Sequence, residues 1–206
     1  MIIYSGIRRK LKTNGSIIPS WTSQGILPPV DPSNPTSTAR SPYVICMSDL
    51  VSRFSTSQDR LSILKGFFSF RSALHGIGLI KGFQWLDGSF LENIELIKAR
   101  SPRDIDVVTF YFPPDNQTQN ELLNNNPQFF DHDYLKDNYH VDAYYVDLSS
   151  KRPENLISKS AYWYGVWSHQ RKTLLWKGYL QVDLSPTDDH IALDNLMRTM
   201  NQEDTS

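Results

Sequence analysis

The spacing of apolar residues predicts one long amphipathic helix over residues 58–78. Ser57 stands directly before this segment and can cap its N-terminus, and Gly76 and Gly78 end the apolar pattern. The apolar positions that repeat at helical spacing are Leu61, Leu64, Phe67, Phe68 and Leu74. We therefore expect one face of this helix to pack in the core.

Shorter segments rich in β-branched and aromatic residues predict strands. These segments are residues 42–47, 79–90, 104–112, 140–148 and 177–184. Further helical patterns cover residues 49–54, 90–100, 155–169 and 185–200, of which residues 90–100 are expected to be helical or partly helical. Ser48 is the candidate N-cap of the first of these helices, and Pro153 fits the first turn of the third. The alternation predicts an α/β or α+β fold with a mixed sheet of about four to six strands flanked by helices.

The ends of the chain differ from its middle in composition. Residues 1–42 are expected to form a Pro/Ser-rich N-terminal arm, because residues 25–42 alone carry five prolines. An extended arm draped over the domain and a partly disordered leader both fit this composition. The core domain is expected over residues 43–200, followed by a flexible polar tail at residues 201–206.

The overall composition is that of an ordinary globular protein, with 39% hydrophobic and 21% charged residues. The formal net charge of −1 gives no positive excess to attract nucleic acid or anionic lipid, so a nucleotide would have to be held locally. The single cysteine, Cys46, excludes an intramolecular disulfide and a zinc site built from cysteines. The N-terminal sequence does not match a signal peptide, and no apolar run approaches the length of a membrane span. These features predict a cytoplasmic protein that is not embedded in a membrane.

Two aspartates are the most informative feature of the predicted strand 104–112. Side chains alternate across a strand, so Asp104 and Asp106 point to one face while Ile105 and Val107 point into the core. Neighbouring carboxylates repel each other unless a cation compensates their charge. Ligands that offer only oxygen suit Mg²⁺ or Mn²⁺. We therefore expect Asp104 and Asp106 to bind a divalent metal.

A third carboxylate from a neighbouring strand would allow two metal ions, which lie about 3.5–4 Å apart in phosphoryl-transfer enzymes. The predicted strand 140–148 offers Asp142 and Asp147. These two residues are five positions apart, so they face opposite sides of the strand and only one can serve. Asp142 is the preferred third ligand, and Asp147 is the alternative.

A Gly-Ser pair follows the predicted strand that ends near residue 87. Gly88 permits a tight turn and a close approach of backbone amides to a phosphate, and the Ser89 hydroxyl can add a hydrogen bond. A helix that starts at Phe90 would direct its N-terminus at the same anion. We therefore expect Gly88 and Ser89 to bind phosphate.

The order of these parts resembles the nucleotidyltransferase superfamily of DNA polymerase β. Its signature is a hydrophobic residue, Gly-Ser or Gly-Gly, a spacer, and Asp-hydrophobic-Asp-hydrophobic. The matching residues are Leu86, Gly88, Ser89, Asp104, Ile105, Asp106 and Val107. The spacer of fourteen residues is slightly longer than is commonest in that signature, which predicts a longer helix or loop after Ser89. Residues 25–185 are also similar to short bacterial nucleotidyltransferase-like proteins of defence or toxin–antitoxin type.

The resemblance implies a nucleotidyltransferase fold and a metal-dependent enzyme. It implies that Asp104, Asp106 and Asp142 bind two Mg²⁺ (or Mn²⁺) ions and that Gly88 and Ser89 contact the triphosphate. The expected reaction transfers a nucleoside monophosphate from an NTP or dNTP to a hydroxyl acceptor and releases pyrophosphate. The acceptor would belong to a nucleotide, an oligonucleotide or a protein. The expected setting is bacterial antiviral defence, with an effector or toxin protein as partner.

Two alternatives stay open beside a nucleotide-synthesising enzyme. One is protein nucleotidylation by an AMPylating antitoxin, and the other is a non-catalytic binding or regulatory module with the same fold. The intact set of aspartates with Gly-Ser favours an enzyme. A hydrolase has less support, because the chain contains no Gly-x-Ser-x-Gly motif.

Cations and aromatic residues near the predicted helix 155–169 are further candidates. Arg171 and Lys172 would neutralise the charge of a bound triphosphate, although positive charge at a helix C-terminus also has a purely structural explanation. Trp163 and Trp167 could stack on a base, but their spacing of four residues on one helical face favours core packing.

Overall fold

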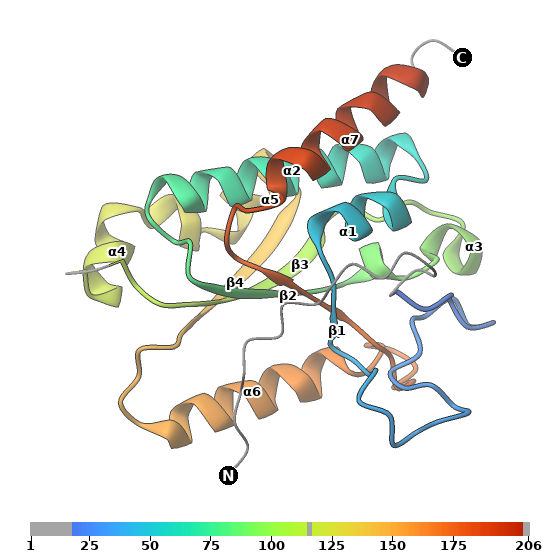
Figure 1. Ribbon diagram of the computed structural model, residues 1–206, viewed down its shortest axis with the longest axis horizontal. Coiled ribbons are helices and arrows are strands. Elements are labelled where there is room, and N and C mark those ends of the chain that lie inside the picture. The colour runs from blue at the N-terminus through green and yellow to red at the C-terminus, as the bar shows by residue number, and fades with distance from the viewer. Residues whose placement is uncertain (1–17, 115–116, 204–206) are drawn as a thin grey trace.

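The computed structural model describes residues 18–114 and 117–203, which fold around a five-stranded mixed sheet. The strands lie in the order β1-β5-β2-β3-β4 (Figure 1). They comprise β1 Tyr43–Val44, β2 Gly82–Asp87, β3 Ile105–Tyr111, β4 Val141–Asp147 and β5 Leu180–Asp183. β2 pairs antiparallel with both β3 and β5, whereas β4 runs parallel to β3 and β1 runs parallel to β5. The expected mixed sheet of four to six strands is confirmed.

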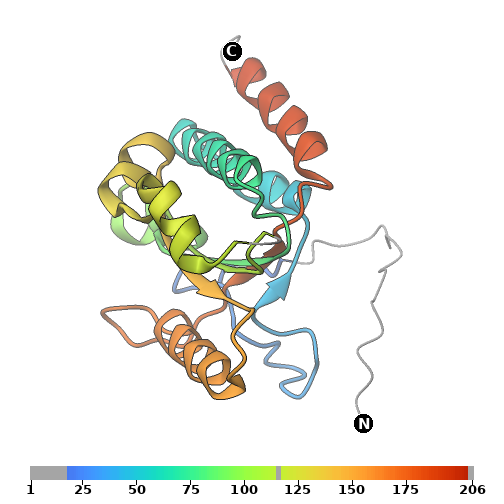
Figure 2. The ribbon, with the colours of Figure 1, turned by 90° about the vertical axis from the view of Figure 1, so that its left-hand side faces the viewer.

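Helices cover both faces of this sheet. Figure 1 shows α1, α2 and α7 on one face and α6 on the other, and Figure 2 shows the same layers from the side. The helices are α1 Met47–Phe54, α2 Gln58–Gly76, α3 Ile94–Lys98, α4 Gln119–Asn125, α5 His132–Tyr139, α6 Pro153–Trp167 and α7 Asp189–Glu203, with short 3₁₀-helices η1 Ser89–Leu91 and η2 Pro127–Phe130. The structure is therefore α+β, with the sheet between two helical layers.

The long helix α2 forms as its apolar pattern predicts. The Ser57 hydroxyl accepts a hydrogen bond from the backbone N–H of Arg60, and the helix ends at Gly76. Its apolar face is buried against the sheet. The guanidinium of Arg71 on the same helix is buried and bonds Gln84 of β2 at 2.6 Å and Asp189 of α7 at 2.8 Å. α2 thus joins the sheet to the C-terminal helix.

The start of α1 differs from the sequence-based expectation. Ser48 lies inside the helix, which begins at Met47 after Cys46. The Asp49 carboxylate accepts the backbone N–H of Cys46 at 3.3 Å, and the Asp188 carboxylate, far along the chain, accepts the N–H of Met47 at 2.8 Å. These two carboxylates satisfy the first amides of the helix, so no serine cap is needed.

The described part of the N-terminal arm packs on the core domain. Trp21 donates its indole N–H to the backbone oxygen of Leu91 at 2.7 Å, and the Leu27 backbone oxygen accepts the N–H of Gly178 at 2.7 Å. The side chains of Leu27 and Ile18 are buried. Residues 18–42 are therefore an extended arm held against the domain, and residues 1–17 lie outside the described residues.

The C-terminal boundary also moves relative to the expectation. α7 continues to Glu203, so residues 201–203 belong to a helix and not to the expected tail. Residues 204–206, the rest of that tail, lie outside the described residues.

Candidate functional site

Four aspartates meet at one end of the sheet. In the strand register, Asp106 of β3 lies between Asp87 of β2 and Asp142 of β4. Residues in register on neighbouring strands point to the same face, and such strands lie about 4.7–4.9 Å apart. Asp104 is two residues before Asp106 and directly precedes β3, so it faces the same way. The structure thus brings the three predicted aspartates together and adds Asp87; we call these four residues the acid cluster.

The acid cluster lies on the face of the sheet that α6 covers. Tyr144, two residues after Asp142 and on the same face, has its ring 4.7 Å from that of Trp163 in α6. Asp147 lies at the other end of β4 on the opposite face and accepts the backbone N–H of Ser149 at 2.7 Å. Asp147, the alternative third ligand, is therefore not part of the acid cluster.

The Gly-Ser turn lies directly against the acid cluster. Gly88 has a φ of +87°, in the left-handed region that favours glycine. A Cβ atom at this position would overlap the Oδ2 atom of Asp106. Ser89 follows and begins the short helix η1. Glycine is required here because only its bare Cα lets the turn approach the carboxylate.

Residues 90–100 are partly helical, as one of the two expectations has it, but the helix expected to start at Phe90 does not form. η1 is a 3₁₀-helix of three residues, and α3 begins only at Ile94 and has five residues. The buried guanidinium of Arg60 accounts for the interruption, because it donates to the backbone oxygens of Phe90 and Glu92 at 2.7 Å each. A continuous α-helix would need those oxygens for its own hydrogen bonds. The expected helix N-terminus aimed at a phosphate is therefore not available.

A buried lysine holds the Gly-Ser turn from the other side. The Nζ of Lys177 lies 2.9 Å from Oδ1 of Asp87 and 3.4 Å from Oε1 of Glu92, and all three side chains are nearly inaccessible to solvent. Gln170 donates from Nε2 to the second oxygen of Glu92 at 3.0 Å. Because Asp87 and Glu92 flank the turn in sequence, this ion-pair network fixes both of its ends.

Negative charge is in excess at the acid cluster. Burial, followed by repulsion from Asp87, Asp104 and Asp142, raises the pKa of Asp106 to about 7, although Lys177 opposes the shift. Burial also raises the pKa of Asp87 to about 6 against the effect of Lys177. Burial raises the pKa of Asp104 as well. The site would therefore be stabilised by an added cation.

Both oxygens of the Asp142 carboxylate already have a partner. Its Oδ1 lies 2.7 Å from Nδ1 of His132, and its Oδ2 lies 2.8 Å from Nζ of Lys136, both on α5. Across residues 18–114 and 117–203, no group of three or more His, Cys, Asp or Glu side chains is arranged to hold a metal ion. The strand register therefore brings the predicted metal ligands to one face of the sheet, while the Asp142 carboxylate contacts His132 and Lys136 of α5.

The predicted cations after α6 lie on the same side as the acid cluster. Burial, Asp142 and Asp106 raise the pKa of the Tyr144 hydroxyl, and the positive charges of Lys136 and Arg171 oppose this shift. Lys172 is exposed in the same turn. Trp167 is buried, with its ring 5.5 Å from that of Trp163, so the core-packing interpretation of this pair is confirmed.

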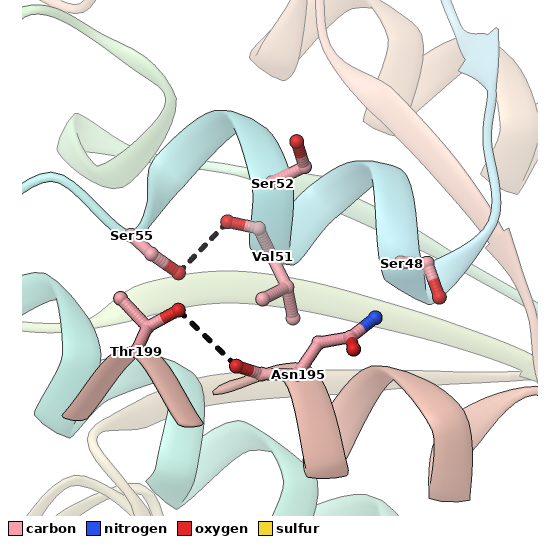
Figure 3. Close-up of a pocket in the computed structure, with 6 residues that line it drawn as sticks. All are labelled: Ser48, Val51, Ser52, Ser55, Asn195 and Thr199. Atoms are coloured by element: carbon pink, nitrogen blue, oxygen red, sulfur yellow. Dashed lines mark hydrogen bonds between the residues drawn. The ribbon is translucent and has the colours of Figure 1, made fainter. Parts of the chain in front are cut away.

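A separate groove lies between α1 and α7 (Figure 3). Its volume is about 350 Å³, and its lining residues are Ser48, Val51, Ser52, Ser55, Asn195 and Thr199. The hydroxyls of two of them are already bonded to backbone oxygens within their own helices, as Figure 3 shows. A groove lined by hydroxyl, amide and aliphatic groups provides no acid, base or metal ligand, so we assign the candidate site to the acid cluster.

Four residues of the site were not identified from the sequence: Asp87, Lys177, Lys136 and His132. A signal exists for Asp87, because it ends a predicted strand immediately before the Gly-Ser pair. The two lysines and the histidine carry no such signal, because their contacts join segments that are distant in the chain or depend on how a helix docks.

The fold and site define an α+β protein with an acidic site at one end of a mixed sheet. The chain belongs to the family described as "Family of unknown function (DUF6932)", which matches residues 19–183. No curated protein and no solved structure matches the chain significantly. Among the described residues, no helix combines the length and apolar character needed to cross a membrane.

Proposed function

We propose that this protein is a metal-dependent nucleotidyltransferase. The observation that carries the proposal is the placement of Asp104, Asp106 and Asp142 on one face at one end of the sheet, beside the Gly88 turn. The chain order supports it as well: a strand, a Gly-Ser turn, a strand with two aspartates and a parallel strand with a third. These are the parts that the resemblance to the DNA polymerase β superfamily implies, and a nucleotidyltransferase fold is part of the proposal.

The donor set suits a divalent cation. Asp104, Asp106 and Asp142 offer only oxygen atoms, which Mg²⁺ and Mn²⁺ prefer. Burial raises the pKa of both Asp106 and Asp104, and neighbouring carboxylates add to the shift, so a bound cation would stabilise their ionised forms. These three aspartates would hold two ions, which when bound would neutralise charge on the triphosphate and on the leaving pyrophosphate.

The remaining groups would position the reactants. The Ser89 hydroxyl would bind a phosphate oxygen where Gly88 allows the backbone to approach, and Arg171 would add positive charge from the α6 side. An acceptor hydroxyl beside Asp142 would attack the α-phosphorus. The new P–O bond would form as the bond to pyrophosphate breaks, and the hydroxyl proton would pass to Asp142.

The acceptor is proposed to be a hydroxyl of a nucleotide, an oligonucleotide or a protein. With a net charge of −1, the chain has no general attraction for long nucleic acid, which favours a small nucleotide or a protein. A role in bacterial antiviral defence, an effector or toxin partner and a cytoplasmic location stay predictions of the sequence.

Incubation with each radiolabelled NTP and dNTP tests the proposal. Reactions with Mg²⁺ or Mn²⁺ are resolved on a denaturing gel and by protein autoradiography. We expect labelled product with the wild type, a loss of about 10³-fold in Asp106→Asn, and retained activity in Asp147→Asn, whose side chain lies on the other face. Label in a free oligomer would identify a nucleotide-synthesising enzyme, and label on protein would identify nucleotidylation. Full activity in Asp106→Asn would refute the mechanism.

One observation favours a second function, a non-catalytic binding or regulatory module. Both oxygens of Asp142 are occupied by His132 and Lys136, as in a structural ion pair. A protein of this kind would label nothing with any nucleotide, and Asp106→Asn would match the wild type in every cellular assay. The same experiment therefore separates the two functions.

A further inference from the structure

The contact of Asp142 with α5 is unlike the other ion pairs at the site. Lys136 and His132 approach the two oxygens of one carboxylate, at 2.8 and 2.7 Å. The side chains of these two residues are 41% and 45% exposed, whereas Asp142 is 14% exposed. The Lys136 ammonium and the His132 ring therefore lie at the solvent side of the acid cluster and can leave it without unfolding the chain.

The position of α5 in the fold holds His132 and Lys136 beside Asp142. His132 and Lys136 are four residues apart, so both lie on one face of the helix. The helix is held from behind by α2, where a Cβ atom on Gly66 would overlap the backbone oxygen of Tyr139. His140, in a left-handed conformation, then leads directly into β4, the strand that carries Asp142. The short path from α5 to β4 fixes the helix beside the carboxylate.

Lys136 acts on more than Asp142. The hydrogen bond that the Lys136 ammonium donates to Asp142 is the main cause that raises its pKa, against the effect of burial, and the charges of Asp142, Asp104 and Asp106 raise it further. Lys136 is also the strongest charge that opposes the raised pKa of Asp104. One ammonium group thus pairs directly with Asp142, which lies in register with Asp106 on the face assigned to the metal ions.

We propose that Lys136 is the internal counter-ion of the acid cluster and that a divalent cation displaces it when it binds. This inference rests on the proposed function, because it takes Asp104, Asp106 and Asp142 as the metal ligands. The ammonium group competes with the metal for Asp142, so it lowers the intrinsic metal affinity and offsets part of the negative charge of the acid cluster without metal. Metal arriving together with the phosphates of a nucleotide would bring additional ligands and so overcome the competition.

Binding of Mn²⁺ alone tests this inference without any measurement of activity. The full-length wild type, Lys136→Met and the control Lys65→Met are titrated with Mn²⁺, and the free ion is followed by electron paramagnetic resonance. Lys65 is an exposed lysine on α2, on the other side of the sheet, so its change removes the same charge away from the acid cluster. We expect Lys136→Met to bind Mn²⁺ roughly fivefold more tightly, which corresponds to the loss of one partly exposed ion pair of about 1 kcal/mol, and Lys65→Met to match the wild type.

Thermal unfolding provides a second readout on the same proteins. The rise in Tm between EDTA and saturating Mn²⁺ should be larger in Lys136→Met than in the wild type, because the metal replaces a charge that the variant lacks. Lys136→Gln serves as the second variant if Lys136→Met fails to fold, as judged by circular dichroism. Equal or weaker Mn²⁺ binding in the folded variant overturns the inference.

Asp106→Asn distinguishes failure of this inference from failure of the proposed function. If Asp106→Asn abolishes Mn²⁺ binding while Lys136→Met binds like the wild type, the acid cluster binds metal and only the displacement of Lys136 is refuted. If neither the wild type nor Lys136→Met binds Mn²⁺ alone, the inference is refuted, and if neither binds Mn²⁺ in the presence of ATP beyond what ATP itself binds, the metal-dependent function is refuted as well.

Discussion

Replacing Asp106 with asparagine should stabilise the metal-free protein at alkaline pH. Burial and then three neighbouring carboxylates raise the pKa of Asp106 from 3.8 to about 7 in the folded chain. In the unfolded chain the group ionises near its ordinary pKa, so folding takes up a proton between about pH 4 and pH 7. The free energy of unfolding therefore falls as the pH rises through this window and levels off above pH 7.

The size of this fall in the free energy of unfolding follows from the pKa shift of Asp106. A difference of about three pH units at about 1.36 kcal/mol per unit corresponds to about 4 kcal/mol above pH 7. About 3 kcal/mol of this loss of stability develops between pH 5 and pH 8, and the loss is absent below pH 4. Asparagine has nearly the same shape and stays neutral, so the variant avoids this loss.

Urea unfolding followed by tryptophan fluorescence measures the effect at pH 5 and pH 8 in EDTA. Asp137→Asn is the matched control, because Asp137 is exposed on α5. The stability of Asp106→Asn relative to the wild type should increase by about 3 kcal/mol from pH 5 to pH 8, while Asp137→Asn shows no such trend. A difference that does not change with pH, or an Asp106→Asn protein less stable than the wild type at pH 8, would refute the reasoning.

Two further substitutions test the turn beside the acid cluster by the same unfolding measurement. Lys177→Met should cost about 3–5 kcal/mol at pH 8, because it leaves Asp87 and Glu92 buried without a cation, and a loss below about 1 kcal/mol would contradict this. Gly88→Ala should cost at least about 1–2 kcal/mol from its positive φ alone, whereas Gly76→Ala, at a helix end with open space around it, should cost nothing. Equal effects of the two alanines would exclude the proposed overlap with Asp106.

The elements that could be predicted from the sequence are those set by local patterns. α2, β3 and α6 lie where apolar periodicity, β-branched runs and Pro153 predict them, because each signal is contained within the element. The alternation of side chains likewise predicts that Asp104 and Asp106 share a face. Local patterns thus predicted half of the acid cluster without any knowledge of the tertiary structure.

The errors arose where a distant side chain satisfies a backbone group. Arg60, some thirty residues earlier in the chain, binds the backbone oxygens of Phe90 and Glu92 and prevents the helix expected there. Asp188 binds the first amide of α1 from the other end of the domain. The pairing of Asp87 with Asp106 similarly depends on strand register, which a single sequence does not reveal.

The two lysines at the acid cluster have different environments, and this difference bears on their roles. Lys177 and Asp87 are each only 6% exposed, so removing their ion pair would leave a buried charge, and we infer that the pair is permanent. Lys136 is 41% exposed, and water can solvate its ammonium group once it leaves Asp142. Of these two lysines, only Lys136, on the α5 side of the acid cluster, can therefore be replaced by another cation without leaving a buried charge unpaired. If the site takes up metal, Asp142 is the carboxylate that must change partners, while Asp87 keeps the turn in place.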